Sequence, residues 1–186
     1  HTPRFHPSDF RVKTLDGVAD DWPISYWDIE KYYDINDEMM GCSGIDGDPA
    51  NPPKSKRQMS PLPIGPDGER IAKAADRLGW HWWPSDSYQA SEDYKGRVGW
   101  NNHGTFASKK KWQSIASTDH TYINPAIKNG LEVRANCAVQ SISVDNTGKL
   151  KGVVYVDDKG VQYFQEAGKV IVACNGIGTP RLLLSS

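Results

Sequence analysis

The sequence predicts an α/β chain with helices in its first half and strands in its second. Three observations support this prediction. Apolar residues recur at helical spacing within 25–78, strand-like segments separated by turn residues follow residue 130, and a continuous apolar run at 170–173 precedes a glycine turn and a helix start. This order indicates an α/β region preceded by a region of helices and long loops.

The first predicted helix spans Ser25 to Met40. Ser25 is a suitable N-cap, Asp28 stands three residues later as in a weak capping box, and Gly41 provides a stop. Residues 1–24 are polar and rich in Pro and Asp, so we expect an extended loop there. Residues 41–66 are dense in Gly and Pro and predict a long loop, which inside a compact domain is usually functional or disordered.

The second predicted helix spans Asp67 to Leu78 and ends at Gly79. We expect its buried stripe to consist of Ile71, Ala74, Ala75 and Leu78. A group of tryptophans follows, and for these we favour packing against the adjacent helix over stacking on sugar rings: Trp80, Trp82, Trp83 and Trp100. Residues 85–111 predict irregular structure, and 117–128 predict a short helix or turn broken near Pro125.

The strands begin at Leu131. The segment 131–145 alternates in places, and Lys151–Val156 and Val161–Phe164 flank a turn, so they predict a hairpin. The run Val170–Ala173 fits a strand buried on both faces of a parallel sheet. After it, Thr179 can cap a helix and Pro180 suits the first helical position.

The glycine turn after this last strand admits two interpretations. In open α/β sheets, such a turn brings backbone N–H groups and a helix N-terminus to the edge where anionic ligands bind. A tight turn that needs glycine for positive φ explains the same residues without a ligand. Gly176 and Gly178 form only G-x-G, so the motif alone favours the tight turn.

Composition excludes several functions. Lys and Arg total 22 and Asp and Glu total 23, so the formal net charge is -1 and no basic footprint for nucleic acid exists. No run is long and apolar enough to span a membrane.

The three cysteines, Cys42, Cys137 and Cys174, form no CxxC pair, and we expect Cys137 and Cys174 to be buried free thiols.

Four passages of the chain resemble one family of flavoenzymes, in the right order. They are RFHPSDFR at 4–11, DWPISYWDIEKYYDINDEMMGCSG at 21–44, SIASTDHTYINPAIKNGLEVRANCAVQSI at 114–142, and KVIVACNG at 169–176 with the Thr-Pro and leucines of 179–184 after it. Together they resemble the glucose–methanol–choline (GMC) oxidoreductases, in the gluconate- and fructose-dehydrogenase-like branch. The resemblance covers nearly the whole chain.

The resemblance implies a fold and a division into domains. It implies part of an FAD/NAD(P)-binding three-layer (ββα) domain plus part of an α+β substrate domain. Residues 1–19 would be a linker after a flavin motif, 20–128 the substrate-domain and connecting segment, and 129–186 the C-terminal part of the FAD-binding domain. We therefore expect an interior section of a longer enzyme, completed by the rest of the same polypeptide or by a complementing chain.

Four residues are implied as contacts of the FAD cofactor. Val139 matches a strand position whose backbone lies against the adenine. Cys174, Asn175 and Gly176 match the turn near the ADP half of the cofactor. Many family members carry Ala-Gly where this chain has Cys174-Asn175, and asparagine tolerates the left-handed backbone that such a turn requires.

The implied activity is oxidation of an alcohol group of a sugar, polyol or related alcohol by hydride transfer to FAD. An electron-acceptor subunit is a further candidate partner. The family's GxGxxG loop, its ribose-binding acidic residue and its catalytic pair, usually His with His or Asn, are missing from this sequence, so we assign no catalytic residue and no metal ligand. By resemblance His1 follows a second flavin-side motif, and Asn101–Gly104 predict a surface loop.

Two alternative functions stay open. A non-catalytic carbohydrate-binding or interaction module would account for the seven tryptophans, but a β-sandwich would carry strands throughout. A nicotinamide-dependent enzyme would need the same missing glycine loop. Smaller motifs favour plain structural explanations, namely turn chemistry for Asp46 and Asp48, and no hydrolase role for Asp119 and His120 because no serine stands in a nucleophile elbow.

Overall fold

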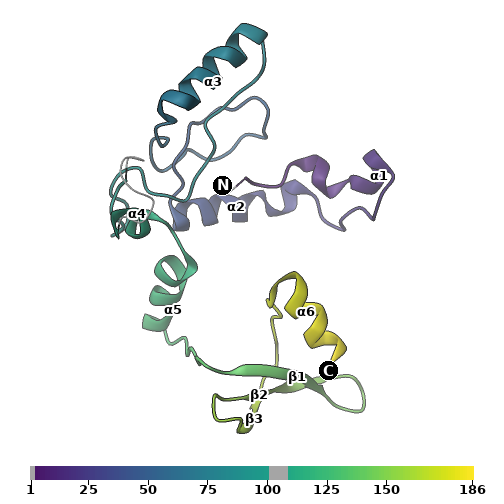
Figure 1. Cartoon of the computed structure of the whole chain (residues 1–186). Helices are drawn as coiled ribbons and strands as arrows, with labels where there is room; N and C mark the ends of the chain where they lie inside the picture. The colour runs from purple at the N-terminus through teal and green to yellow at the C-terminus, as the bar shows by residue number, and fades with distance from the viewer. Residues whose placement is uncertain (1–2, 101–108) are drawn as a thin grey trace. The chain divides into compact units, whose positions relative to one another are not determined.

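The computed structural model describes residues 3–100 and 109–186 and divides the chain into two compact units, 1–130 and 131–186 (Figure 1). His1 and the loop predicted at Asn101–Gly104 lie outside the described residues. Each unit is described by itself below. No helix in the described ranges is long and apolar enough to cross a membrane.

The first unit is helical with long loops. Its elements are η1 (Pro7–Phe10), α1 (Val12–Asp16), α2 (Tyr26–Met40), α3 (Gly65–Leu78), α4 (Lys109–Ser114), the π-helical η2 (Asp119–Ile123) and α5 (Asn124–Lys128). The helix predicted at 117–128 is therefore present as η2 and α5. The two follow one another without a gap, so Pro125 does not break the helix but lies just after π-helical bonding changes to α-helical bonding.

The start of the chain corrects one prediction. An extended loop was expected over 1–24, but η1 and α1 occupy part of it. The reason is a local hydrogen bond. The His6 N–H donates to the Asp9 carboxylate at 2.7 Å and fixes the first turn of η1.

Helix α2 follows the prediction. Its N-cap is Ser25, whose N–H and hydroxyl both donate to the Asp28 carboxylate at 2.8 Å. Gly41, with φ of +70°, ends the helix. Hydrogen bonds from Ser25 are the first cause of the lowered pKa of Asp28.

Helix α3 corrects the predicted stripe. Ile71 is 70% and Leu78 is 60% exposed, whereas Ala72 and Ala75 are buried. Periodicity gives the spacing of an apolar stripe, but the neighbouring structure decides which part of it is covered. Here only a narrow alanine face is covered.

The long loop after α2 is ordered by short bridges. Ser43 pairs with Met59 in parallel and with Ser87 in antiparallel direction, and the Ser43 and Ser87 backbones exchange hydrogen bonds of 2.8 and 3.0 Å. Much of the core of this unit lies around these crossings, and its buried members include Phe10, Tyr26, Cys42, Met59, Ala90 and Trp100.

The second unit is an antiparallel meander with one helix. Strands β1 (Ala138–Val144), β2 (Leu150–Val156) and β3 (Gln162–Glu166) lie in the order β1-β2-β3, and α6 spans Asn175–Leu184. The predicted hairpin is confirmed as β2 and β3. Its turn forms because the Asp157 carboxylate accepts the N–H groups of Lys159 and Val161 at 2.9 Å.

Two strand predictions in this unit are wrong. Residues 131–137 carry no strand, and Val170–Ala173 do not form the buried strand that their composition suggested. A strand needs hydrogen-bonded neighbours, and in the described part of this unit only β1, β2 and β3 pair. Ile171 is consequently 93% exposed.

The cysteine and helix-start predictions also need correction. Cys174 is exposed and Cys137 half-buried, because both lie outside the strands; Cys42 is the buried thiol. Helix α6 begins at Asn175, so Pro180 lies inside it and Thr179 is not the cap. The Thr179 hydroxyl instead accepts the Cys174 N–H at 3.1 Å.

Candidate functional site

The turn at Cys174–Gly176 is formed by a single asparagine side chain. Asn175 has φ of +61°, in the left-handed region. Its Oδ1 accepts the N–H groups of Ile177 at 2.9 Å and Gly178 at 3.1 Å, which starts α6. The predicted turn therefore coincides with the N-terminus of a ten-residue helix, where backbone dipoles favour negative charge.

This turn is open to a ligand. All three residues are exposed, and a Cβ built on Gly176 would meet nothing within 4 Å. Gly178, by contrast, is packed, since a Cβ there would approach the Cys174 Cβ to 3.0 Å. Gly178 is therefore a packing position, whereas Gly176 leaves room beside the backbone.

Val139 lies on β1 opposite Tyr155 of β2 and is 44% exposed. A register shift between Val139 and Ser141 interrupts the ladder directly after it, and such a bulge alters the direction of nearby backbone groups. Val139 also lines an open pocket of about 420 Å³, together with Glu132, Arg134, Cys137, Val153, Tyr155 and Gln165.

Arg134 lines this pocket. Its guanidinium donates to the Tyr155 hydroxyl at 3.1 Å, to Gln165 at 2.8 Å and to Glu132 at 2.7 Å. The hydrogen bonds from Arg134 lower the pKa of Glu132. The resemblance did not single out Arg134 as a pocket residue, although an arginine shortly before a predicted strand could have suggested one.

Val139 and the turn lie toward opposite ends of α6. The C-terminal residues of the chain contact β1, because the Ile142 N–H donates to the Ser186 hydroxyl at 2.9 Å and Ser185 donates to the Gln140 carbonyl at 3.3 Å. The turn is at the other end of the helix, roughly 15 Å away along its axis. The structure places all four predicted residues in one unit, with Cys174, Asn175 and Gly176 in one turn and Val139 on the sheet.

A second polar centre, not predicted from the sequence, lies in the first unit around Asp37. One Asp37 oxygen accepts from Arg4 at 2.6 Å and from Arg57 at 2.8 Å, and the other accepts from the Tyr88 hydroxyl at 2.7 Å. The side chains of Asp37 and Arg57 are each 3% exposed. This group of Arg4, Asp37, Arg57 and Tyr88 is called the Asp37 network below.

The Asp37 network changes the acidity of its neighbours. Burial, followed by the charges of Asp86 and Asp37, raises the pKa of the Cys42 thiol to about 11. Burial and the hydrogen bond to Asp37 raise the pKa of Tyr88 as well. For Asp34, burial opposes ionisation, but hydrogen bonds from Arg4 and Ser55 outweigh it and lower the pKa.

A signal for this network was present in the sequence. Tyr26, Tyr33 and Asp37 are spaced seven and four residues apart and therefore share one face of α2. A carboxylate on the same helix face as aromatic side chains that pack inward is rarely left unpaired. The partners Arg57 and Tyr88 could not be identified in this way, because they come from loops.

The remaining candidates have structural explanations. The Asp48 carboxylate accepts the Ala50 N–H at 3.0 Å, as turn chemistry requires. Asp46 instead accepts the N–H of Arg57, eleven residues later, at 2.7 Å, so it joins two parts of the loop and does not form a local turn. His120 and Asp119 form an exposed pair at 3.6 Å. Within 3–100 and 109–186, no three His, Cys, Asp or Glu side chains gather in a way that could hold a metal.

The tryptophans do not form one group. Trp82 donates its ring N–H to Asp76 of α3 at 2.7 Å, while Trp83 donates to the Ile45 carbonyl at 3.1 Å. Trp80 is 68% exposed and Trp100 is buried. The expected packing against α3 therefore has direct support for Trp82 alone.

Comparisons with known proteins agree with one another. A family model described as GMC oxidoreductase matches residues 10–186. The chain is 39% identical over 191 residues to 2-methyl-1,2-propanediol dehydrogenase of Mycolicibacterium austroafricanum, covering 100% of this chain and 34% of that protein. It is 26% identical over 198 residues to the fructose dehydrogenase large subunit of Gluconobacter japonicus, and the match covers 97% of this chain and 34% of that protein. The chain thus spans about a third of the length of these relatives.

Proposed function

The chain belongs to the GMC oxidoreductase family, and on that premise we propose that the protein containing it is an FAD-dependent oxidoreductase that oxidises an alcohol group of a sugar, polyol or related alcohol. The observation that carries the proposal is the family match over 10–186. Both relatives are named as dehydrogenases, one for a diol and one for fructose. Nothing favours the alternative of a non-catalytic binding module.

The second unit is proposed to hold the ADP half of FAD. Val139 would read the adenine edge through its backbone N–H and carbonyl, which requires only a small side chain. Cys174, Asn175 and Gly176 would face the anionic part of the cofactor, because the N-terminus of α6 favours negative charge.

When bound, FAD supplies the hydride acceptor. The residues of this chain contribute binding and orientation, and we assign the proton-accepting base to none of them. His6, His81 and His120 are each engaged locally, with Ser8, Asp48 and Asp119. The remaining parts of the site, and an electron-acceptor subunit, would come from the rest of the polypeptide or from other chains.

The first test is a visible absorption spectrum of the intact natural protein before and after denaturation. Flavin bands that change on unfolding are expected. A full-length sample without flavin would contradict the proposal.

The second test addresses the turn itself. Gly176→Val should weaken FAD binding by about tenfold or more, a free-energy change of 1.4 kcal/mol, because its side chain would occupy the space beside the backbone. Gly168→Ala is the control, since its Cβ also meets nothing within 4 Å. Fluorescence titration of the apoprotein with FAD measures both, and equal affinity of the two variants would remove the turn from the site.

A further inference from the structure

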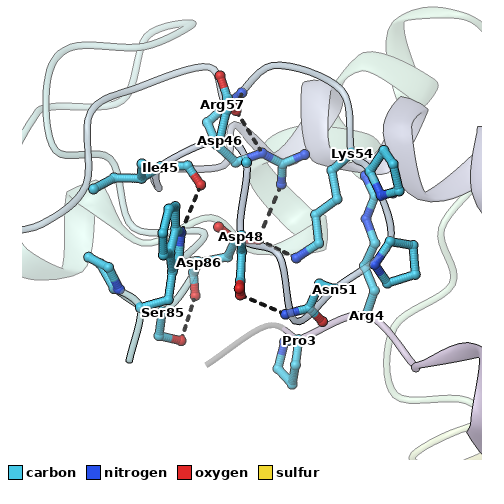
Figure 2. Close-up of a pocket in the computed structure, with 15 residues that line it drawn as sticks. Pro3, Arg4, Ile45, Asp46, Asp48, Asn51, Lys54, Arg57, Ser85 and Asp86 are labelled. Atoms are coloured by element: carbon cyan, nitrogen blue, oxygen red, sulfur yellow. Dashed lines mark hydrogen bonds and ion pairs between the residues drawn. The ribbon is translucent and has the colours of Figure 1, made fainter. Parts of the chain in front are cut away.

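Charged and polar side chains around a cavity of about 280 Å³ in the first unit pair with one another (Figure 2). Lys54 donates to the Asp86 carboxylate at 3.0 Å, and the Asn51 amide donates to the Asp48 carboxylate at 2.7 Å. Arg57 lies 3.4 Å from the same Asp86 carboxylate. These contacts join loops to one another, so the charged groups of this cavity have a structural explanation.

In the second unit, Arg134 joins the segment before β1 to the other two strands. Residues 131–136 carry no strand. In the described part of the chain, their hydrogen bonds to the sheet all come from the Arg134 guanidinium, which donates to the Tyr155 hydroxyl of β2 at 3.1 Å and to the Gln165 side chain of β3 at 2.8 Å. The guanidinium carbon also lies 5.7 Å from the Tyr155 ring centroid. One planar side chain therefore attaches this segment to the sheet.

The Arg134 guanidinium is itself held in one orientation. Its Nε donates to one Glu132 oxygen at 2.7 Å and its Nη2 donates to the other at 3.3 Å, so the pair is bidentate and Nη1 is left to donate to the strands. The Arg134 side chain is 41% exposed and the Glu132 side chain 70%. An ion pair with this exposure adds little stability, so its main effect is on geometry.

Tyr155 connects Arg134 to Val139. It is the cross-strand partner of Val139, and its ring stacks on Tyr163 of β3 with ring centroids 5.3 Å apart. The ladder is interrupted between Val139 and Ser141, so regular pairing does not fix the backbone on that side of Val139. The orientation of Val139 therefore depends on the chain before it, which Arg134 attaches to Tyr155.

We propose that Arg134 is a positioning residue that, through Tyr155, holds the Val139 backbone in place for the adenine of FAD. The assignment rests on the proposed function of the second unit as part of an FAD site. Binding groups must be held within about 0.5 Å of their productive geometry by supporting residues, so a small displacement of Val139 is enough to weaken the contact. The effect of Arg134 should be confined to the adenosine half of the cofactor.

The test is titration of the intact natural protein, freed of cofactor, with FAD and with ADP, which carries the adenosine half alone. Arg134→Met removes the guanidinium and should weaken both ligands by about fivefold. At saturating FAD, the visible flavin bands of this variant should match those of the wild type, whereas a general loosening of the site would change them. Lys159→Met is the matched control, because it removes the same charge from an exposed position of the β2–β3 turn that does not line the pocket.

Two further variants test the connection through Tyr155. Tyr155→Phe keeps the ring and loses the acceptor, so it should also weaken FAD and ADP, and adding Arg134→Met to it should cause little further loss. Arg134→Lys keeps the charge but cannot reach several acceptors at once, so its affinities should fall between those of the wild type and Arg134→Met. Fully additive losses would show that Arg134 does not act through Tyr155.

The outcomes separate this assignment from the cofactor proposal. A wild type that binds FAD, with Arg134→Met binding FAD equally well, overturns the positioning role alone, and so does a loss of affinity for FAD without one for ADP. A wild type that binds no FAD overturns both proposals. Thermal melts identify loss of folding in Arg134→Met. In that case Tyr155→Phe, which lacks only a hydroxyl, decides, and affinities equal to those of the wild type would overturn the positioning role.

Discussion

At the scale of single residues, Asp37 joins two nearly buried arginines and a tyrosine of the first unit. One carboxylate, 3% exposed, accepts hydrogen bonds from two arginines and one tyrosine. Burying charges costs free energy, and the hydrogen bonds and ion pairs of the Asp37 network offset that cost only while every partner is present. Removing one side chain therefore leaves the remaining buried groups without full compensation.

We expect Asp37→Asn to destabilise the intact protein by about 3 to 5 kcal/mol, because two nearly buried arginines lose their shared negative charge. Urea unfolding measures the change. Asp20→Asn serves as control, since Asp20 is exposed and should alter stability by less than about 0.5 kcal/mol. Equal unfolding midpoints for the two variants would show that the network contributes nothing measurable.

Cys42 should make stability fall in alkali. Burial and the neighbouring carboxylates raise the pKa of its thiol from 9.0 in the unfolded chain to about 11 in the folded one. The folded state thus keeps the Cys42 proton to higher pH than the unfolded state does. The stability that this difference contributes is complete below pH 9 and is lost between pH 9 and 11. We expect the loss to reach about 2–3 kcal/mol. Cys42→Ala should flatten the curve of unfolding free energy against pH.

At the scale of elements, sequence patterns identified those that are stabilised locally. Helix α2 and the β2–β3 hairpin could be predicted, since a capping box and an aspartate turn act within a few residues. The irregular structure of Val170–Ala173 could not be predicted, because a strand depends on neighbouring strands that composition does not specify. The resemblance indicated a turn at Asn175, but not that the Asn175 side chain would accept the first N–H groups of α6.

The meander has one position where only glycine fits. A Cβ at Gly152 of β2 would lie 2.1 Å from the Gln165 carbonyl oxygen of β3. We expect Gly152→Ala to destabilise the second unit by about 1–3 kcal/mol through forced separation of the strands. Hydrogen exchange of the β2 and β3 amides would report it, and Gly168→Ala should leave exchange unchanged. Unaltered protection in Gly152→Ala would show that the strands can adjust.

At the scale of the whole molecule, much apolar surface is uncovered. Ile171 is 93%, Leu184 89% and Ile177 83% exposed, and Ile71 and Trp80 follow at 70% and 68%. Single exposed apolar residues are normal, but several large ones on each unit are characteristic of surfaces that pack against other structure. Both relatives contain further sequence that could supply such structure, because this chain matches only about a third of each.

We therefore expect residues 1–186, expressed alone, to unfold without a cooperative transition and to bind a hydrophobic dye. Differential scanning calorimetry and dye fluorescence measure the two properties. The intact natural protein is the control and should show a sharp transition. A cooperative melt of the isolated chain would mean that its own core is sufficient.

The Asp37 network also sets the order in which the first unit can form during synthesis. Arg4 leaves the ribosome before Asp37, Arg57 and Tyr88, and the Tyr122 hydroxyl donates to Asn36 across 86 positions of sequence. Such distant contacts slow folding, because the chain between them must be ordered before they form. The charges of Arg4 and Asp37 therefore stay hydrated until the later loops arrive. In the second unit the β2–β3 hairpin joins near neighbours and can form early, whereas the hydrogen bonds of Ser185 and Ser186 to β1 must wait for the end of the chain.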